Sequence, residues 1–142
     1  MHSIVFPKAG PSSICRIVEN TTRLPLKKNE LRIKVAYSGI NFADIMARNG
    51  QYRDAPPFPF VVGYEVSGVV IEAGSPHLNT WVNKEVMCMT HFGGYASEVI
   101  CNEFAVYEKP KNFSLQEAAA FPVNYLTAYL LIIGMGSLKK DE

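Results

Sequence analysis

The stretch from Ser38 to Gly74, SGINFADIMARNGQYRDAPPFPFVVGYEVSGVVIEAG, constrains the fold more than any other part of the chain. Asn41 is placed to cap a short helix, because its side chain can bond a free N–H of the first turn. Gly50 is placed to end that helix, since glycine adopts the left-handed conformation without penalty. The three prolines in DAPPFPF exclude regular structure from the segment after the helix. We therefore expect a turn, a short helix and a stiff loop before the next strand.

The strand expected after this loop, VVGYEVSGVVIEAG, is interrupted by Gly63 and Gly68. Glycines inside a strand indicate a bulge, or the close approach of another backbone or a ligand. Glu65 lies between them in an apolar run, and a buried carboxylate needs a partner. We expect Glu65 to contact a nearby Arg or a backbone amide rather than act as a base. We expect Asp44 to be a helix-start charge rather than a catalytic acid.

Residue identities, order and spacing in this stretch resemble the signature GINFxD…R.G.Y…P…G.E..G.V...G of the medium-chain dehydrogenase/reductase superfamily. The similarity is to its zinc-independent quinone oxidoreductase branch, and NFADIMARNGQY is closest to the vesicle amine transport proteins, relatives of zeta-crystallin. The resemblance extends over nearly the whole chain. It implies a GroES-like catalytic domain that uses NADPH to reduce a small-molecule quinone or α,β-unsaturated carbonyl by hydride transfer. The sequence does not distinguish NADP from NAD.

The resemblance also bears on zinc. Zinc-dependent relatives have a Cys near the start of the short helix and a His before the Glu of a G-H-E motif, where this chain has Asn41 and Tyr64. Neither residue suits zinc, which takes Cys, His or carboxylate ligands. The three histidines have no ligand-like spacing. We expect no metal site, so a carbonyl group must be polarised by hydrogen bonds.

Five polar residues are candidates for that chemistry: Asn41, Tyr52 and Tyr64 as catalytic groups, and Asn41, Asn124 and Thr127 as cofactor contacts. In the quinone reductase branch, residues matching Asn41 and Tyr52 line the cleft where nicotinamide and substrate meet. The residue matching Thr127 lies against the nicotinamide end of the cofactor. Amides and hydroxyls can orient a nicotinamide and donate to a developing oxyanion.

Structural alternatives exist for these residues. Asn41 can be a helix cap only, and Tyr52 can simply cover the Pro-rich loop. Tyr64 can be core packing, and Thr127 can bond back to its own helix.

The rest of the chain predicts a mainly β fold with short helices. Residues 30–37 alternate, which predicts an antiparallel strand with one face buried (Leu31, Ile33, Val35 and Tyr37) and one face exposed (Glu30, Arg32 and Lys34). Further strands are expected at 2–7, 13–19, 84–90, 95–101 and 104–108, with Gly93-Gly94 as the turn of a hairpin. These short strands predict a partly open barrel, which the resemblance identifies as GroES-like.

The C-terminal part predicts two helices. Ser114 and Glu117 form a capping box, and Pro122 can begin a second helix that runs from about Val123 to Ile133. We therefore divide the chain into a GroES-like catalytic domain, 1–120, and a linking helix, 121–142. The helix would lead into a Rossmann domain that is absent from this chain, because no G-x-G-x-x-G turn occurs. We expect the isolated chain to be inactive.

Composition limits the other possibilities. A net charge of +1 without a basic run argues against a nucleic-acid partner. Three widely spaced cysteines fit free thiols in a reducing compartment, and the N-terminus does not resemble a signal peptide, so we expect a cytoplasmic protein. The apolar run from Val123 to Met135 is shorter than the ~20 residues that span a bilayer, so we expect no integral membrane segment and a buried helix.

Two functions remain open at this point. The chain can be part of an oxidoreductase, or it can be a non-enzymatic GroES-like binding or assembly module. Polar Asn124 and Thr127 on an apolar helix favour the enzyme. Apolar faces left exposed on that helix would promote self-association, so we expect a homo-oligomer.

Overall fold

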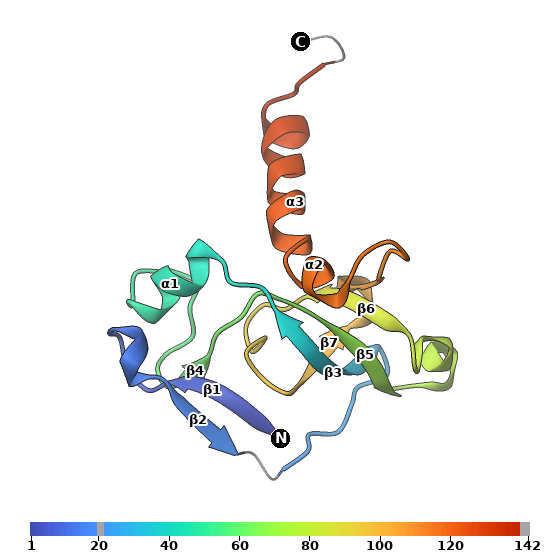
Figure 1. The fold of residues 1–142 in the computed structure, drawn as a ribbon, viewed down its shortest axis with the longest axis horizontal. Helices are drawn as coiled ribbons and strands as arrows, with labels where there is room; N and C mark the ends of the chain where they lie inside the picture. Colours follow the sequence, from blue (N-terminus) through green and yellow to red (C-terminus); the bar gives the residue numbers. More distant parts are fainter. Residues whose placement is uncertain (20–21, 140–142) are drawn as a thin grey trace.

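Two antiparallel sheets form the body of the molecule in a computed structural model that describes residues 1–19 and 22–139 (Figure 1). The smaller sheet has the order β2-β1-β4, with β1 at His2–Phe6, β2 at Arg16–Glu19 and β4 at Phe60–Val61. The larger has the order β7-β3-β5-β6-β8, with β3 at Glu30–Ser38, β5 at Glu65–Ala73, β6 at Glu85–Met89, β7 at Glu98–Asn102 and β8 at Val106–Glu108. The larger sheet curls into a half-barrel, which confirms the predicted mainly β, GroES-like partly open barrel.

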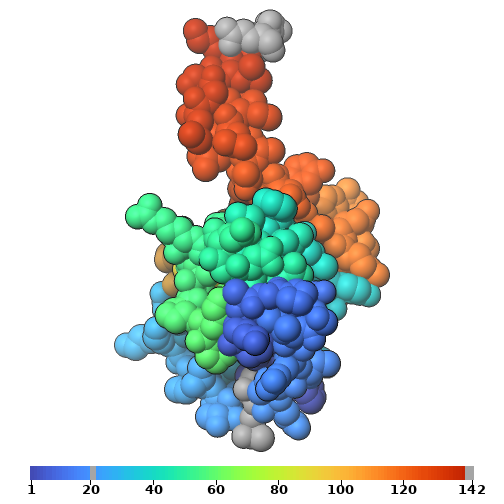
Figure 2. Space-filling model, turned by 90° about the vertical axis from the view of Figure 1, so that its left-hand side faces the viewer, coloured from blue at the N-terminus to red at the C-terminus, as the bar shows by residue number. Residues whose placement is uncertain are grey.

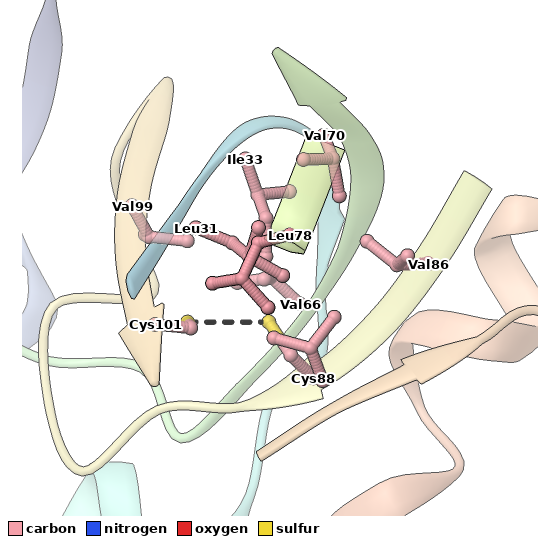
Figure 3. Packing of buried hydrophobic residues seen from close by; sticks show 10 residues of the cluster. Leu31, Ile33, Val66, Val70, Leu78, Val86, Cys88, Val99 and Cys101 are labelled. Carbon is pink, nitrogen blue, oxygen red and sulfur yellow. Dashed lines mark hydrogen bonds between the residues drawn. The ribbon is translucent and has the colours of Figure 1, made fainter. Parts of the chain in front are cut away.

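The core lies inside the curled sheet (Figure 3). Leu31 and Ile33 of β3 meet Val66 of β5 there, all three without solvent exposure. Across this core the Sγ atoms of Cys88 and Cys101 lie 3.4 Å apart as free thiols. The contact with Cys101 and then burial raise the pKa of the Cys88 thiol, so it remains protonated and packs as an apolar group.

The predicted hairpin at Gly93-Gly94 is wrong. Strand β6 pairs with β5 and β8, whereas β7 pairs with β3 on the other side of the sheet. The glycines instead allow close backbone contact, because the Gly94 N–H donates to the Gly63 carbonyl at 3.1 Å. A turn composition predicts a change of direction but not which strands pair afterwards.

Strand β3 departs from its predicted alternation at two positions. Arg32 is only 2% exposed, because its guanidinium donates to the Glu72 carboxylate at 2.7 Å and to the Leu24 carbonyl at 2.5 Å. Tyr37 is 42% exposed, and the register shifts just before it, between Val35 and Tyr37. Arg32 is buried by a loop, and Tyr37 is turned outward at a bulge. Alternation of apolar and polar residues predicts neither the loop nor the bulge.

The short helices begin where the sequence predicts. Helix α1 spans Phe42–Arg48 with Asn41 at its N-cap, and α2 spans Leu115–Ala119 behind the Ser114 and Glu117 capping box. Helix α3 spans Pro122–Tyr129 and continues as a π-helical segment, η4, at Leu130–Met135. Three 3₁₀ segments, η1 at Ser12–Ile14, η2 at Pro76–Trp81 and η3 at Glu103–Ala105, complete the connections.

Helix α3 and η4 stand away from the body instead of packing in it (Figures 1 and 2). Tyr125 is 61% exposed and Leu130 is 58% exposed, so the prediction of a buried helix is wrong for this chain. An apolar run alone does not say whether a covering surface is present. None of the helices within the described ranges is both long and apolar enough to cross a membrane. Residues 140–142 of the predicted linking segment lie outside the described residues.

Substitution of Gly63 tests the close backbone contact. Gly63 and Gly93 both have positive φ, +108° and +92°, so Ala is strained at either position. A Cβ at Gly63 would lie 2.6 Å from the Tyr95 nitrogen, whereas nothing lies within 4 Å of one at Gly93. We expect Gly63→Ala to lower the free energy of unfolding by about 1–3 kcal/mol more than Gly93→Ala in urea titrations. Equal losses would contradict this packing.

Candidate polar site at the start of α1 and α3

Asn41 is the most buried residue of the predicted site. It is 8% exposed, at the turn between β3 and α1. Its backbone N–H donates to Asp44 Oδ2 at 2.7 Å, and its side-chain Nδ2 donates to Glu65 Oε1 at 2.9 Å. Asn41 is therefore the predicted N-cap, but its amide is also bound to a buried carboxylate. The amide oxygen Oδ1 belongs to the capping box with Asp44 and, having two lone pairs, can still accept from a ligand.

Glu65 joins three elements. It has no solvent exposure, and its second oxygen, Oε2, accepts the backbone N–H of Val123 at 2.9 Å. That N–H belongs to the first turn of α3, where helix N–H groups lack intrahelical partners. The predicted buried structural role of Glu65 is thus seen, with a backbone amide and the Asn41 side chain as its partners. Through this carboxylate, Asn41 on the α1 side and the start of α3 are held to one point on β5.

Asp44 makes a second buried contact that the sequence did not reveal. Its Oδ1 accepts the Gly63 N–H at 3.1 Å while its Oδ2 accepts the Asn41 N–H. Burial raises the pKa of the Asp44 carboxyl, and contacts from Asn41, Tyr95 and Gly63 oppose that rise. Asp44 is therefore more than a helix-start charge, since it fixes the loop before Tyr64 to α1.

Two tyrosines lie beside this network. The rings of Tyr52 and Tyr64 are 5.8 Å apart in an edge contact, and Tyr64 also packs on Phe92 at 5.0 Å. The Tyr64 hydroxyl is buried and has no well-formed hydrogen bond among the described residues. Burial, the nearby Tyr52 and Asp44 all raise the pKa of Tyr64, so it stays a neutral donor. Both tyrosines thus make aromatic packing contacts, and the Tyr64 hydroxyl is directed at Tyr52.

The α3 candidates are less constrained. Asn124 is exposed and its Nδ2 donates to the Ala120 carbonyl at 3.2 Å, a contact within its own helical region. Thr127 is exposed one turn further along α3, and the described residues do not bond its hydroxyl back to the helix. The structure therefore brings Asn41 to the start of α3 but leaves Thr127 outside the hydrogen-bond network.

The site also contains residues that sequence reasoning missed. Tyr95 has a buried hydroxyl directed at Asp44, and burial followed by the Asp44 charge raises its pKa. Thr90 Oγ1 donates to the Gly63 carbonyl at 2.6 Å. Neither residue lies in a recognisable motif, and only the return of the chain from β6 brings both to Gly63. No sequence signal identifies them.

One cavity of the surface lies beside this network and shares Tyr95 with it. A cavity of about 460 Å³ is bounded by β1, β3 and residues 95–97, with Ile17, Tyr37 and Ile40 among its lining residues. Two of its serines are hydrogen-bonded as follows: Ser38 donates to the Gly94 carbonyl, and Ser97 accepts the His2 N–H. Among residues 1–19 and 22–139, no three His, Cys, Asp or Glu side chains are grouped so that they could hold a metal ion.

Residues 27–125 match the family described as the alcohol dehydrogenase GroES-like domain. The chain belongs to this GroES-like family. It is 37% identical over 125 residues to the rat protein "Quinone oxidoreductase-like protein 2", a match that covers 88% of this chain and 36% of the rat protein. The chain thus spans about a third of that relative's length. This confirms the medium-chain dehydrogenase/reductase resemblance.

Solved structures of the same superfamily superpose closely on this GroES-like domain. The human synaptic vesicle membrane protein VAT-1 homolog-like protein matches with a TM-score of 0.90 and 32% identity over 98% of this chain and 45% of that one. The quinone oxidoreductase of Escherichia coli, solved in complex with NADPH, matches with a TM-score of 0.86 and 29% identity over 100% of this chain and 43% of that one.

The Asp44 carboxylate gives this GroES-like domain a testable pH dependence. Its pKa is raised in the folded state, so between 3.8 and the folded value the native chain binds more protons than the unfolded chain. Stability contributed by this group is therefore lost as pH rises through that window. The Asp44→Asn variant lacks this titrating carboxyl group. The other carboxylates contribute equally to the free energy of unfolding of both proteins, so their contributions cancel in the difference. We expect the stability difference, wild type minus Asp44→Asn, to fall from pH 4 to pH 7 in urea titrations, and a rising difference would contradict the burial.

Proposed function

We propose that this chain is the N-terminal catalytic domain of an NADPH-dependent, zinc-independent oxidoreductase that reduces quinones or α,β-unsaturated carbonyls. The observation that carries the proposal is the placement of Asn41: its side-chain amide donates to the buried Glu65 carboxylate and its backbone N–H donates to the buried Asp44 carboxylate, beside the Tyr52–Tyr64 pair. At the positions where zinc-using relatives have ligands, the chain has an amide and a phenol built into hydrogen-bonding and aromatic contacts. The family relationship and an NADPH-bound relative support it.

The residues present suit the nicotinamide end of NADPH. The Asn41 Oδ1 can accept from a carboxamide, and the Tyr64 hydroxyl is a neutral donor. Bound cofactor would supply the hydride. In this proposal Asn41 orients the nicotinamide, Tyr64 and Tyr52 donate to the substrate oxygen as its charge develops, and Thr127 contacts the cofactor from α3. Residues 121–142 link residues 1–120 to the nucleotide-binding domain, and free thiols fit a cytoplasmic location.

Tyr52 tests the chemistry. In the natural protein that carries this domain, Tyr52→Phe removes one donor and keeps the ring contact with Tyr64. We expect NADPH-dependent reduction of 1,4-benzoquinone to fall roughly 10- to 100-fold in kcat. Tyr107→Phe on β8, which is 42% exposed, is the matched control and should keep full activity. Unchanged turnover in Tyr52→Phe across several quinones would remove Tyr52 from the mechanism.

The second candidate is a non-enzymatic binding or assembly module, and the exposed α3–η4 segment favours it. A thermal shift of the natural protein with NADPH separates the two functions. A rise in melting temperature supports the oxidoreductase, because a ligand that binds only the native state stabilises it. An unchanged melting temperature supports the module.

We also propose that the chain self-associates through α3 and η4, whose exposed apolar side chains are Tyr125, Leu126, Tyr129, Leu130, Leu131, Ile132, Ile133 and Met135. Sedimentation velocity of residues 1–142 should show an average mass that grows with concentration. Leu130→Lys should shift the chain toward monomer. Leu24→Lys, at a loop position of similar exposure, should not. A monodisperse wild-type monomer would contradict this proposal.

A further inference from the structure

The orientation of the Asn41 amide is set by its partner. An ionised carboxylate only accepts hydrogen bonds, so Glu65 Oε1 requires the NH2 group of Asn41 to face it. Glu65 cannot turn away, because Oε2 is held by the Val123 N–H and the carboxylate has no solvent exposure. A side chain at Gly39 would also collide with Glu65 Oε1, so the backbone closes that side.

We propose that Glu65 is a positioning residue that turns the Asn41 amide so that Oδ1, and not the NH2 group, is offered to the nicotinamide carboxamide. This rests on the proposed function only in naming the nicotinamide. The same carboxylate holds the first turn of α3 to Asn41, and the helix carries the other cofactor candidates, Asn124 in that turn and Thr127 in the next. The buried Glu65 side chain thus determines which end of the Asn41 amide faces the ligand, and it also holds α3 next to Asn41.

Replacement of Glu65 by Gln gives a distinctive prediction. The variant Glu65→Gln has one acceptor oxygen in place of two, and that oxygen is expected to keep the Val123 N–H. The Gln NH2 group then faces Asn41, whose amide must turn over to offer Oδ1 to it. The Asp44 N–H keeps the Asn41 backbone carbonyl as its acceptor at 3.0 Å, so the melting temperature should change little. The group offered to a ligand, however, changes from an acceptor to a donor.

The double variant Asn41→Asp with Glu65→Gln restores the acceptor. The Gln NH2 group donates to the Asp carboxylate, the Gln oxygen keeps the Val123 N–H, and an oxygen is again available at position 41. Asn41→Asp alone places two carboxylates face to face and should be the least stable of the set. Glu72→Gln, on the same strand but bonded to Arg32, is the matched control.

The experiment uses ¹⁵N-labelled residues 1–142 and reduced nicotinamide mononucleotide as the probe. We expect Glu65→Gln to weaken probe binding about tenfold, the double variant to recover to within about threefold of wild type, and Glu72→Gln to bind normally. In the free chain the Asn41 side-chain NH2 protons should exchange slowly with water in wild type and quickly in Glu65→Gln.

Each outcome decides a separate claim. Unchanged Asn41 NH2 exchange in Glu65→Gln would overturn the positioning role, whatever the probe does. Binding that follows the melting temperature across the variants, without recovery in the double variant, would reduce Glu65 to a structural residue. A wild-type chain that binds no probe while Asn41 exchange behaves as expected would contradict the proposed function and leave the positioning of Asn41 supported.

Discussion

The Glu65 carboxylate is the contact on which the arrangement of this site depends. Its two oxygens bond the Asn41 side chain and the Val123 backbone, which are 24 and 58 residues away along the chain. An unpaired buried charge is costly, so the carboxylate is stable only while both partners are in place. The N-cap of α1, the middle of the larger sheet and the base of α3 are consequently positioned together.

Asp44 extends this arrangement to the loop before β5. It accepts N–H groups from Asn41 and from Gly63, and Gly63 in turn contacts the Gly94 backbone. Asn41 therefore lies between two buried carboxylates, each of which receives one of its N–H groups. Such a residue loses little conformational entropy on binding a ligand, because its rotamer is already fixed. This preorganisation, together with the neutral Tyr64 hydroxyl, makes the region suited to binding a planar amide.

Local patterns in the sequence predicted the local structure. The Asn41 cap, the capping box at Ser114 and the start of α3 at Pro122 are recognisable because their partners lie within a few residues. A buried partner of Glu65, an Arg or a backbone amide, was expected from its apolar surroundings, but the Asn41 side chain as a second partner was not. The same reasoning was wrong at Gly93-Gly94, because strand pairing there is long-range. Strands β6 and β7 do not form a hairpin; β6 pairs with β5, and β7 pairs with β3.

Exposure was the other limit of sequence reasoning. The α3–η4 run is apolar enough to be buried, yet it stands away from the barrel, because burial depends on the surface that lies against it and not on composition. Arg32 shows the reverse case, a charged side chain buried by a carboxylate and a loop carbonyl that periodicity cannot anticipate. Tyr95 and Thr90 reach the site only through the tertiary fold.

The most direct test of the central claim is to map where a nicotinamide binds on the wild-type chain. Chemical-shift changes in ¹⁵N-labelled residues 1–142, titrated with NADPH, should centre on Asn41, Tyr52, Tyr64 and the first two turns of α3. Changes centred on the neighbouring cavity at Ile17, Tyr37 and Ile40, with Asn41 unaffected, would contradict this placement of the nicotinamide.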